Sequence, residues 1–180
     1  MSRPSPRSRR RETHRNDGSL ARGLVRSRRG PLIVAAVVVV LDQVSKHWAV
    51  NALDDRMVDI VGSLRFNLAF NEGMAFSRGN GLGPIIGVVA LVVVVVLLVS
   101  VGRATNRWYP RAAGLVMGGA LGNVVDRLFR GRAWLRGGVV DFIDVQWWPI
   151  FNVADMAVTV GGVLLLLTSL SAERRSPVPR

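Results

Sequence analysis

Residues 85–101 form a continuous apolar stretch without a single charged side chain. A run of this length approaches the roughly 20 residues that a helix needs to cross a bilayer. Three other apolar stretches are similar, although each includes ionisable residues. We therefore predict a mainly α-helical membrane protein with a bundle of four transmembrane helices, at about 31–53, 84–102, 110–130 and 153–171. A soluble fold is disfavoured, because 49% of the residues are apolar.

The basic residues are concentrated before the first apolar stretch. Residues 1–30 hold ten Arg against Glu12 and Asp17, so +8 of the net charge of +12 lies there. This composition predicts a flexible tail on the cytoplasmic side, since positive residues resist translocation. With four spans in the domain 31–170, residues 171–180 form a second cytoplasmic tail. A nucleic-acid-binding tail is the alternative, but no basic stripe with interleaved aromatic residues follows, and we predict no nucleic-acid partner.

The connections between the predicted spans support this orientation. Residues 102–111, between the second and third spans, carry three Arg and no acid, as expected on the cytoplasmic side. Residues 56–80 lie on the other side and include alternating stretches such as LRFNL at 64–68. We predict a small extracytoplasmic β-sheet platform at about 56–80.

Metal and thiol chemistry are disfavoured by composition. The chain has no cysteine and only two histidines, His14 in the basic tail and His47 in the first span. A thiolate metal site therefore lacks its side chains, and the isolated histidines disfavour a histidine metal site and a histidine-based triad. We expect neither a metal nor a cofactor, and the carboxylates become the candidates.

Several charged residues lie inside the predicted spans, where each costs on the order of 2.5–3.5 kcal/mol on insertion scales. Asp42 and Lys46 are one helical turn apart on one face of the first span. Asn123, Asp126 and Arg127 end the third span, and Asp126 lies on the ridge of glycines that recur at 114, 118 and 122. Both groups are consistent with a structural polar network and equally with a functional site.

Further acids lie where the third and fourth spans reach the outer face. Asp141 and Asp144 alternate with apolar residues, and Asn152 is placed to cap the fourth span, with Asp155 in its first turn. Two carboxylates in contact can share a proton, so that one activates water while the other protonates a leaving group. The pattern alone does not choose between Asp126, Asp141 and Asp144 as the partner of Asp155.

Two other functions are compatible with some of these residues. A Ser-Lys peptidase would use Ser45 and Lys46, but neighbours on a helix point about 100° apart. A small transporter or channel would use Asp42, Lys46, Asp126 and Asp155 as a charge relay. The transporter or channel hypothesis is disfavoured because most of the acids gather at one end of the spans instead of crossing the membrane.

Five motifs occur in a fixed order: LDQVSK at 41–46, FNEGMAFS at 70–77, GGALGNVVDR at 118–127, VVDF at 139–142 and FNVAD at 151–155. Together they resemble the lipoprotein signal peptidase family, also called signal peptidase II. The resemblance implies an aspartic endopeptidase in the bacterial cell membrane with its active site at the extracytoplasmic face. It would cleave prolipoproteins before the diacylglyceryl-modified cysteine. The segment LFRGRAWLRGG at 128–138 is longer than is usual in the family.

The resemblance also assigns residues and partners. Asp141 and Asp155 correspond to the two catalytic aspartates. The residues expected to bind substrate or support the site are Asp42, Lys46, Asn71, Gly73, Asn123, Asp126, Arg127 and Asn152. The expected partners are diacylglyceryl-modified prolipoproteins and membrane lipids, and we expect the protein to be a monomer.

Overall fold

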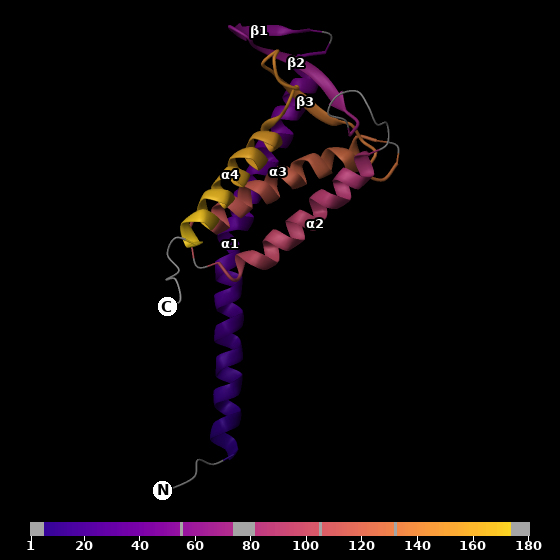
Figure 1. Ribbon diagram of the computed structural model, residues 1–180. Helices are drawn as coiled ribbons and strands as arrows, with labels where there is room; N and C mark the ends of the chain where they lie inside the picture. Colours follow the sequence, from indigo (N-terminus) through magenta and orange to yellow (C-terminus); the bar gives the residue numbers. More distant parts are fainter. Residues whose placement is uncertain (1–5, 55, 74–81, 105, 132, 174–180) are drawn as a thin grey trace.

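The computed structural model describes residues 6–54, 56–73, 82–104, 106–131 and 133–173, with side chains from residue 29 to residue 171. Four helices and a three-stranded sheet make up the described chain (Figure 1). The helices are α1 (Pro6–Ala52), α2 (Gly83–Val101), α3 (Tyr109–Phe129) and α4 (Val153–Glu173). Because α1 begins at Pro6, it includes most of the basic segment, whose flexibility stays a prediction.

Three of the helices have the length and composition of membrane spans. These are residues 29–52 of α1, all of α2 and residues 153–171 of α4, with mean hydropathies of 1.5, 3.2 and 1.9. Aliphatic side chains such as Val92, Val96 and Leu166 lie exposed on their surfaces, as lipid contact requires. The chain is therefore a multi-pass membrane protein, and three of the four predicted spans are found.

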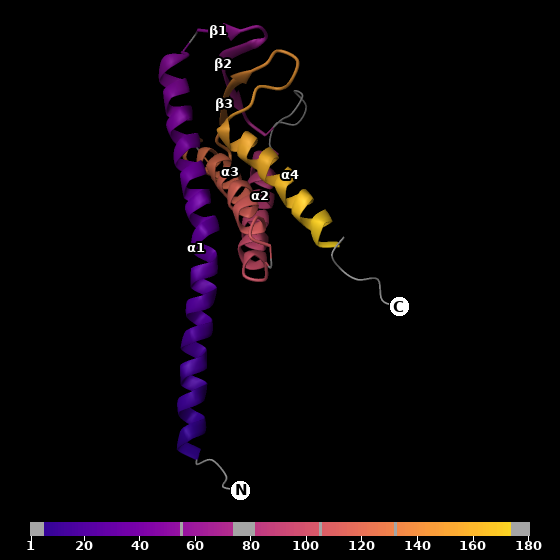
Figure 2. The ribbon, with the colours of Figure 1, turned by 90° about the vertical axis from the view of Figure 1, so that its left-hand side faces the viewer.

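The remaining helix, α3, is less apolar and packs between the others (Figure 2). Its glycines permit this: a Cβ on Gly118 would lie 2.7 Å from Cβ of Val38 in α1. On another face, a Cβ on Gly119 would collide with the carbonyl oxygen of Ala154 in α4. The close helix approach predicted from the glycine ridge is thus confirmed, and α3 forms the centre of the bundle.

A small antiparallel sheet lies beyond one end of the bundle (Figures 1 and 2). Its order is β1 (Val58–Val61), β2 (Leu64–Asn71), β3 (Val139–Asp144), and Phe70 of β2 pairs with Val140 of β3. The predicted platform is found for residues 58–71, whereas residues 74–80 lie outside the described chain. Strand β3 was not predicted.

An aromatic cluster fixes the sheet to α1. The ring of Trp48 lies edge-on to those of Phe66 in β2 and Phe142 in β3, with centroids 5.3 and 6.1 Å apart. Ala49 and Leu53 are buried in the same cluster. Side chains of β3 alternate between the two faces of the sheet. With Phe142 directed at α1, the carboxyl of Asp141 faces the other way.

Candidate active site

The beginning of α4 fixes the first candidate acid, Asp155. The side chain oxygen Oδ1 of Asn152 accepts a hydrogen bond from the backbone N–H of Asp155 at 2.9 Å. In return, the backbone N–H of Asn152 donates to Oδ2 of Asp155 at 3.1 Å. This reciprocal pair is a capping box made from Asn and Asp. It accounts for the predicted cap and holds the Asp155 carboxylate at the positive end of the helix.

The same asparagine links Asp155 to the second candidate acid, Asp141. Its amide Nδ2 donates to Oδ1 of Asp141 at 2.6 Å, while Nδ2 of Asn71 donates to Oδ2 of Asp141 at 3.3 Å. Both acids line one cavity of about 200 Å³, together with Asn71, Gly73 and other predicted site residues. Two carboxyl groups from distant parts of the sequence therefore face a common space.

The environment of Asp141 favours its protonated form. Burial and the nearby charge of Asp155 raise the pKa of Asp141 to about 7. Hydrogen bonds from Asn152 and Asn71, and the charge of Lys46, act in the opposite direction and limit the rise. A buried carboxyl that keeps its proton near neutral pH can act as a general acid.

Lys46 does not line this cavity and is completely buried. Its ammonium group donates to Oδ2 of Asp42 and Oδ2 of Asp126, both at 2.8 Å, and to Oδ1 of Asn123 at 2.9 Å. All three of its N–H bonds are therefore used. Asn123 in turn donates to Oδ1 of Asp155 at 2.9 Å, which connects the buried ions to the cavity.

The two acids that bind Lys46 also hold the backbone next to each candidate acid. Oδ1 of Asp42 accepts the N–H of Ala154 at 2.9 Å, and Oδ2 of Asp126 accepts the N–H of Val140 at 3.2 Å. Val140 and Ala154 directly precede Asp141 and Asp155 in the sequence. Lys46 thus connects Asp42 with Asp126. Through these two residues, the network fixes the position of Asp141 relative to Asp155.

Arg127 and Gly73 complete the wall of the cavity. The guanidinium of Arg127 is buried, and its Nη1 has no hydrogen-bond partner within the described part of the chain. Gly73 has a φ of 107°, and a Cβ there would lie 2.5 Å from the backbone nitrogen of Gly83 in α2. Only glycine fits this turn, whereas Arg127 has one buried donor that the described chain leaves unused.

An apolar groove of about 280 Å³ adjoins the cavity and runs between α2, α3 and α4. Ile86, Asn123, Arg127 and Asp155 line both spaces. The rest of the groove is lined mostly by aliphatic side chains of the three helices. An apolar chain in the bilayer could therefore reach the polar cavity without crossing a polar surface.

Asp144 lies outside the cavity, although the sequence left it open as a partner of Asp155. Its Oδ2 is 2.8 Å from Nε of Arg65 and its Oδ1 accepts the N–H of Gln146 at 2.7 Å. Burial opposes ionisation, but these hydrogen bonds together hold the pKa of Asp144 below its usual value. Asp126 is engaged with Lys46, which leaves Asp141 as the acid that faces Asp155.

The sequence analysis did not predict two members of the buried network, Gln43 and Arg130. Nε2 of Gln43 donates to the carbonyl of Gly122 at 3.2 Å and to Oδ1 of Asp126 at 3.3 Å. Nε of Arg130 lies 2.8 Å from the same Oδ1. The spacing of Asp126 and Arg130, one helical turn, could have indicated this pair. The amide of Gln43 also donates to Oδ2 of the adjacent Asp42 at 3.2 Å. Gln43 gave no such signal, because its two other acceptors are on another helix.

Ser45 offers a direct check on the alternative nucleophile. Its Oγ donates to the carbonyl oxygen of Asp42 at 2.8 Å, and the neighbouring Lys46 has no free N–H. For the peptidase activity that the family resemblance implies, we expect Ser45→Ala to leave the rate within about twofold of wild type, because only a local helix hydrogen bond is lost. A variant without activity, yet with wild-type thermal stability, would revive the Ser-Lys mechanism.

Comparison with known proteins identifies a family and several relatives. Residues 34–171 match the profile of the family described as Signal peptidase (SPase) II. The lipoprotein signal peptidases of Mycobacterium leprae and Rhodococcus jostii are 43% and 42% identical to this chain over 141 residues. These alignments cover 77% of this chain and 70% and 71% of the relatives. A solved structure described as a bacterial membrane enzyme is 25% identical, with a TM-score of 0.71 over 83% of this chain and 93% of that chain.

Proposed function

The chain belongs to the signal peptidase II family, and on this premise we propose that it removes signal peptides from bacterial prolipoproteins. The bond cut would be the one before the diacylglyceryl-modified cysteine. The observation that carries this proposal is the cavity that Asp141 and Asp155 share, with Asn152 bonded to both acids. The adjoining apolar groove suits a substrate that carries acyl chains and arrives from the bilayer.

We infer a hydrolysis in which one proton is shared by the two acids. The ionised carboxylate of Asp155 takes a proton from water, and the resulting hydroxide attacks the carbonyl carbon of the scissile bond. Asp141, which holds the proton, gives it to the leaving nitrogen as the C–N bond breaks. The products are the carboxylic acid of the signal peptide and the free amine of the lipid-modified cysteine.

The other predicted residues would support this chemistry. Asp42, Lys46, Asp126 and Asn123 hold the two acids in register, as their hydrogen bonds suggest. The guanidinium of Arg127, whose Nη1 has no partner in the described chain, would bind a carbonyl oxygen of the substrate. Asn71 and Gly73, which line the cavity, would contact the peptide backbone.

The proposal includes the finer topology. Helix α3 has 21 residues, or about 30 Å of helix at 1.5 Å per residue, which is enough for a fourth span. The start of α1 and the end of α4 both lie away from the sheet (Figure 1). With the basic residues 1–30 in the cytoplasm, the sheet and the cavity would face outward from the cell membrane. Residues 31–170 would be the peptidase domain, and we keep the prediction of a monomer.

A pair of precursor peptides tests the proposed substrate class. The two peptides share one sequence, and only one carries diacylglyceryl on its cysteine. We expect cleavage of the lipidated peptide alone, before the cysteine, as read by mass spectrometry of both products. Equal cleavage of the two peptides, or cleavage at another bond, would overturn the substrate assignment but leave a peptidase.

The pKa of Asp141 predicts the pH dependence. Since the proton leaves as the pH rises through about 7, kcat/KM should fall above this pH by about tenfold per pH unit. The hydrogen bond from Asn71 lowers this pKa, so Asn71→Ala should raise it and move the alkaline limb to higher pH. Initial rates of the wild type and of Asn71→Ala are measured across pH 5–10, and the stability of each protein is checked at each pH. These rates give the alkaline limb of each protein. A limb that shifts to lower pH in the variant contradicts the assignment.

Chelation should have no effect on cleavage. Within the described chain, no three His, Cys, Asp or Glu side chains come together as metal ligands. We expect unchanged rates after prolonged incubation with EDTA. Inhibition that added zinc reverses would instead indicate metal-dependent hydrolysis.

A further inference from the structure

A further pocket, mostly apolar in surface but bordered by several polar side chains, lies at the end of the bundle away from the sheet. It has a volume of about 230 Å³ and is bordered by the last turns of α2 and α4 and by the connection from α2 to α3. Both helices are apolar spans that end here, at Val101 and Ser171. The pocket therefore lies at the boundary between membrane and water, remote from Asp141 and Asp155.

The electrostatic surroundings of this pocket are positive. Residues 102–111 include Arg103, Arg107 and Arg111 and no acid. Helix α3 begins in this connection with no acid in its first turn and no side chain capping its N-terminus, which adds the positive end of a helix dipole. The nearest acid in the sequence of α4 is Glu173, which is followed by Arg174 and Arg175. The excess of positive charge favours an anion.

Two donors in the pocket are unused within the described chain. The last carbonyls of α2 already accept the backbone N–H groups of Arg103 and Ala104, at 2.9 and 3.2 Å, so the Arg103 guanidinium is not needed as a cap. Oδ1 of Asn106 accepts the N–H of Trp108 at 2.8 Å, which orients the Asn106 amide and leaves its Nδ2 available. A guanidinium and an amide N–H are suitable donors for phosphate oxygens.

The pocket also borders surfaces suited to the apolar part of a lipid. Trp108 is half exposed, with the guanidinium groups of Arg107 and Arg111 over its ring at 5.4 and 5.2 Å. Exposed Val99 and Leu170 lie next to pocket residues on α2 and α4. Tryptophan at this level and aliphatic side chains below it match the headgroup and acyl regions of a bilayer.

We propose that this pocket binds the phosphate of an anionic phospholipid headgroup through the Arg103 guanidinium and the Asn106 amide. The site is independent of the proposed peptidase activity. It differs from the general attraction of basic loops to anionic membranes, because it depends on the two residues that line the pocket and not on the total charge of the connection.

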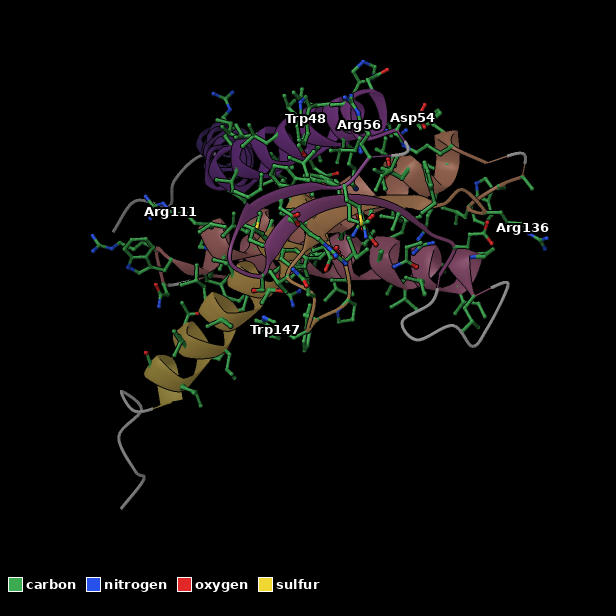
Figure 3. All side chains as sticks on the ribbon, turned by 90° about the horizontal axis from the view of Figure 1, so that it is seen from above. Trp48, Asp54, Arg56, Arg111, Arg136 and Trp147 are labelled. Carbon is green, nitrogen blue, oxygen red and sulfur yellow. The ribbon has the colours of Figure 1, made fainter. Side chains whose placement is uncertain are left out.

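Three variants with the same change in charge separate these possibilities. Arg103→Gln removes one donor, and Asn106→Asp keeps the acceptor for Trp108 N–H while it replaces the amide by a carboxylate. Arg111→Gln is the matched control, since Arg111 is in the first turn of α3, close to the same connection, but does not line the pocket. Figure 3 shows Arg111 at the side of the bundle opposite Arg136, so a further control, Arg136→Gln, removes a distant charge.

The full-length protein in neutral detergent is titrated with phosphatidylglycerol, phosphatidylcholine or inorganic phosphate, and binding is measured as the rise in Tm. About 1 M salt is used, because the Debye length is then about 3 Å and diffuse attraction is screened. We expect tighter binding of phosphatidylglycerol than of the other two. Its affinity should fall about tenfold in Arg103→Gln and Asn106→Asp and stay unchanged in both controls.

Equal losses in Arg111→Gln and Arg103→Gln would overturn the pocket in favour of a diffuse basic surface. Equal stabilisation by phosphatidylcholine would exclude selection for an anionic lipid. Stabilisation by inorganic phosphate at the same concentration as phosphatidylglycerol would overturn the lipid as the ligand. If either pocket variant fails to fold, the other variant decides the outcome.

Discussion

Asn in place of either Asp141 or Asp155 should reduce the rate of precursor cleavage by about 10⁴-fold or more. Each variant keeps the size of the side chain but cannot exchange a proton with water or with the leaving nitrogen. Because the two acids act as a unit, the double variant should be no slower than either single one. Initial rates with one lipidated precursor measure these effects.

Asp144→Asn is the matched control, with the same chemical change at a neighbouring position of β3. Asp144 lies outside the cavity and is bonded to Arg65 and to the N–H of Gln146. We expect its rate to stay within a few fold of wild type, since the partly exposed ion pair with Arg65 contributes roughly 0–1 kcal/mol. An equally inactive Asp144→Asn would indicate that the loss reflects the strand and not the chemistry.

Lys46→Met should lower the free energy of unfolding by about 3–5 kcal/mol and also abolish cleavage. The substitution leaves Asp42 and Asp126, both fully buried, without the ammonium that both contact at 2.8 Å. Their hold on Ala154 and Val140 would then be lost, so the two acids of the cavity would move apart. Thermal unfolding in detergent, followed by tryptophan fluorescence, measures the first effect and precursor cleavage the second.

Two further variants show whether unpaired charge is the cause. Arg130→Met removes a partly exposed partner of Asp126 and should cost much less than Lys46→Met. The double variant Lys46→Met with Asp42→Asn should be more stable than Lys46→Met alone, because one buried carboxylate is removed. An additive further loss of stability in the double variant would contradict the role assigned to Lys46.

The membrane helices could be predicted from the sequence because a helix that crosses the bilayer must be a long apolar segment. The strand β3 could not, since VVDFID is short and its pairing partner Leu64–Asn71 is about 70 residues away. Helix α3 was predicted as an apolar stretch, and its glycines predicted its close packing against a neighbouring helix. Its packing between α1 and α4 compensates for the smaller apolar area of small side chains.

Only part of the candidate site could be predicted from the sequence. The sequence FNVAD indicated a helix cap at Asn152 with Asp155 in the first turn, because capping depends on neighbours three residues apart. The choice of Asp141 came from family resemblance, and the geometry now gives an independent reason for it. The bonds from Asp42 to Ala154 and from Asp126 to Val140 join distant segments, so no local pattern could have revealed them.

Single-turnover cleavage, with enzyme in excess over one lipidated precursor, tests the proposed dyad most directly, because substrate recruitment and product release then do not limit the rate. Wild type, Asp141→Asn, Asp155→Asn and Asp144→Asn are compared at equal folded concentration. We predict cleavage by the wild type and Asp144→Asn, and only background hydrolysis by the other two, which should still bind the precursor. A near-wild-type rate in either Asp141→Asn or Asp155→Asn would contradict the two-aspartate mechanism.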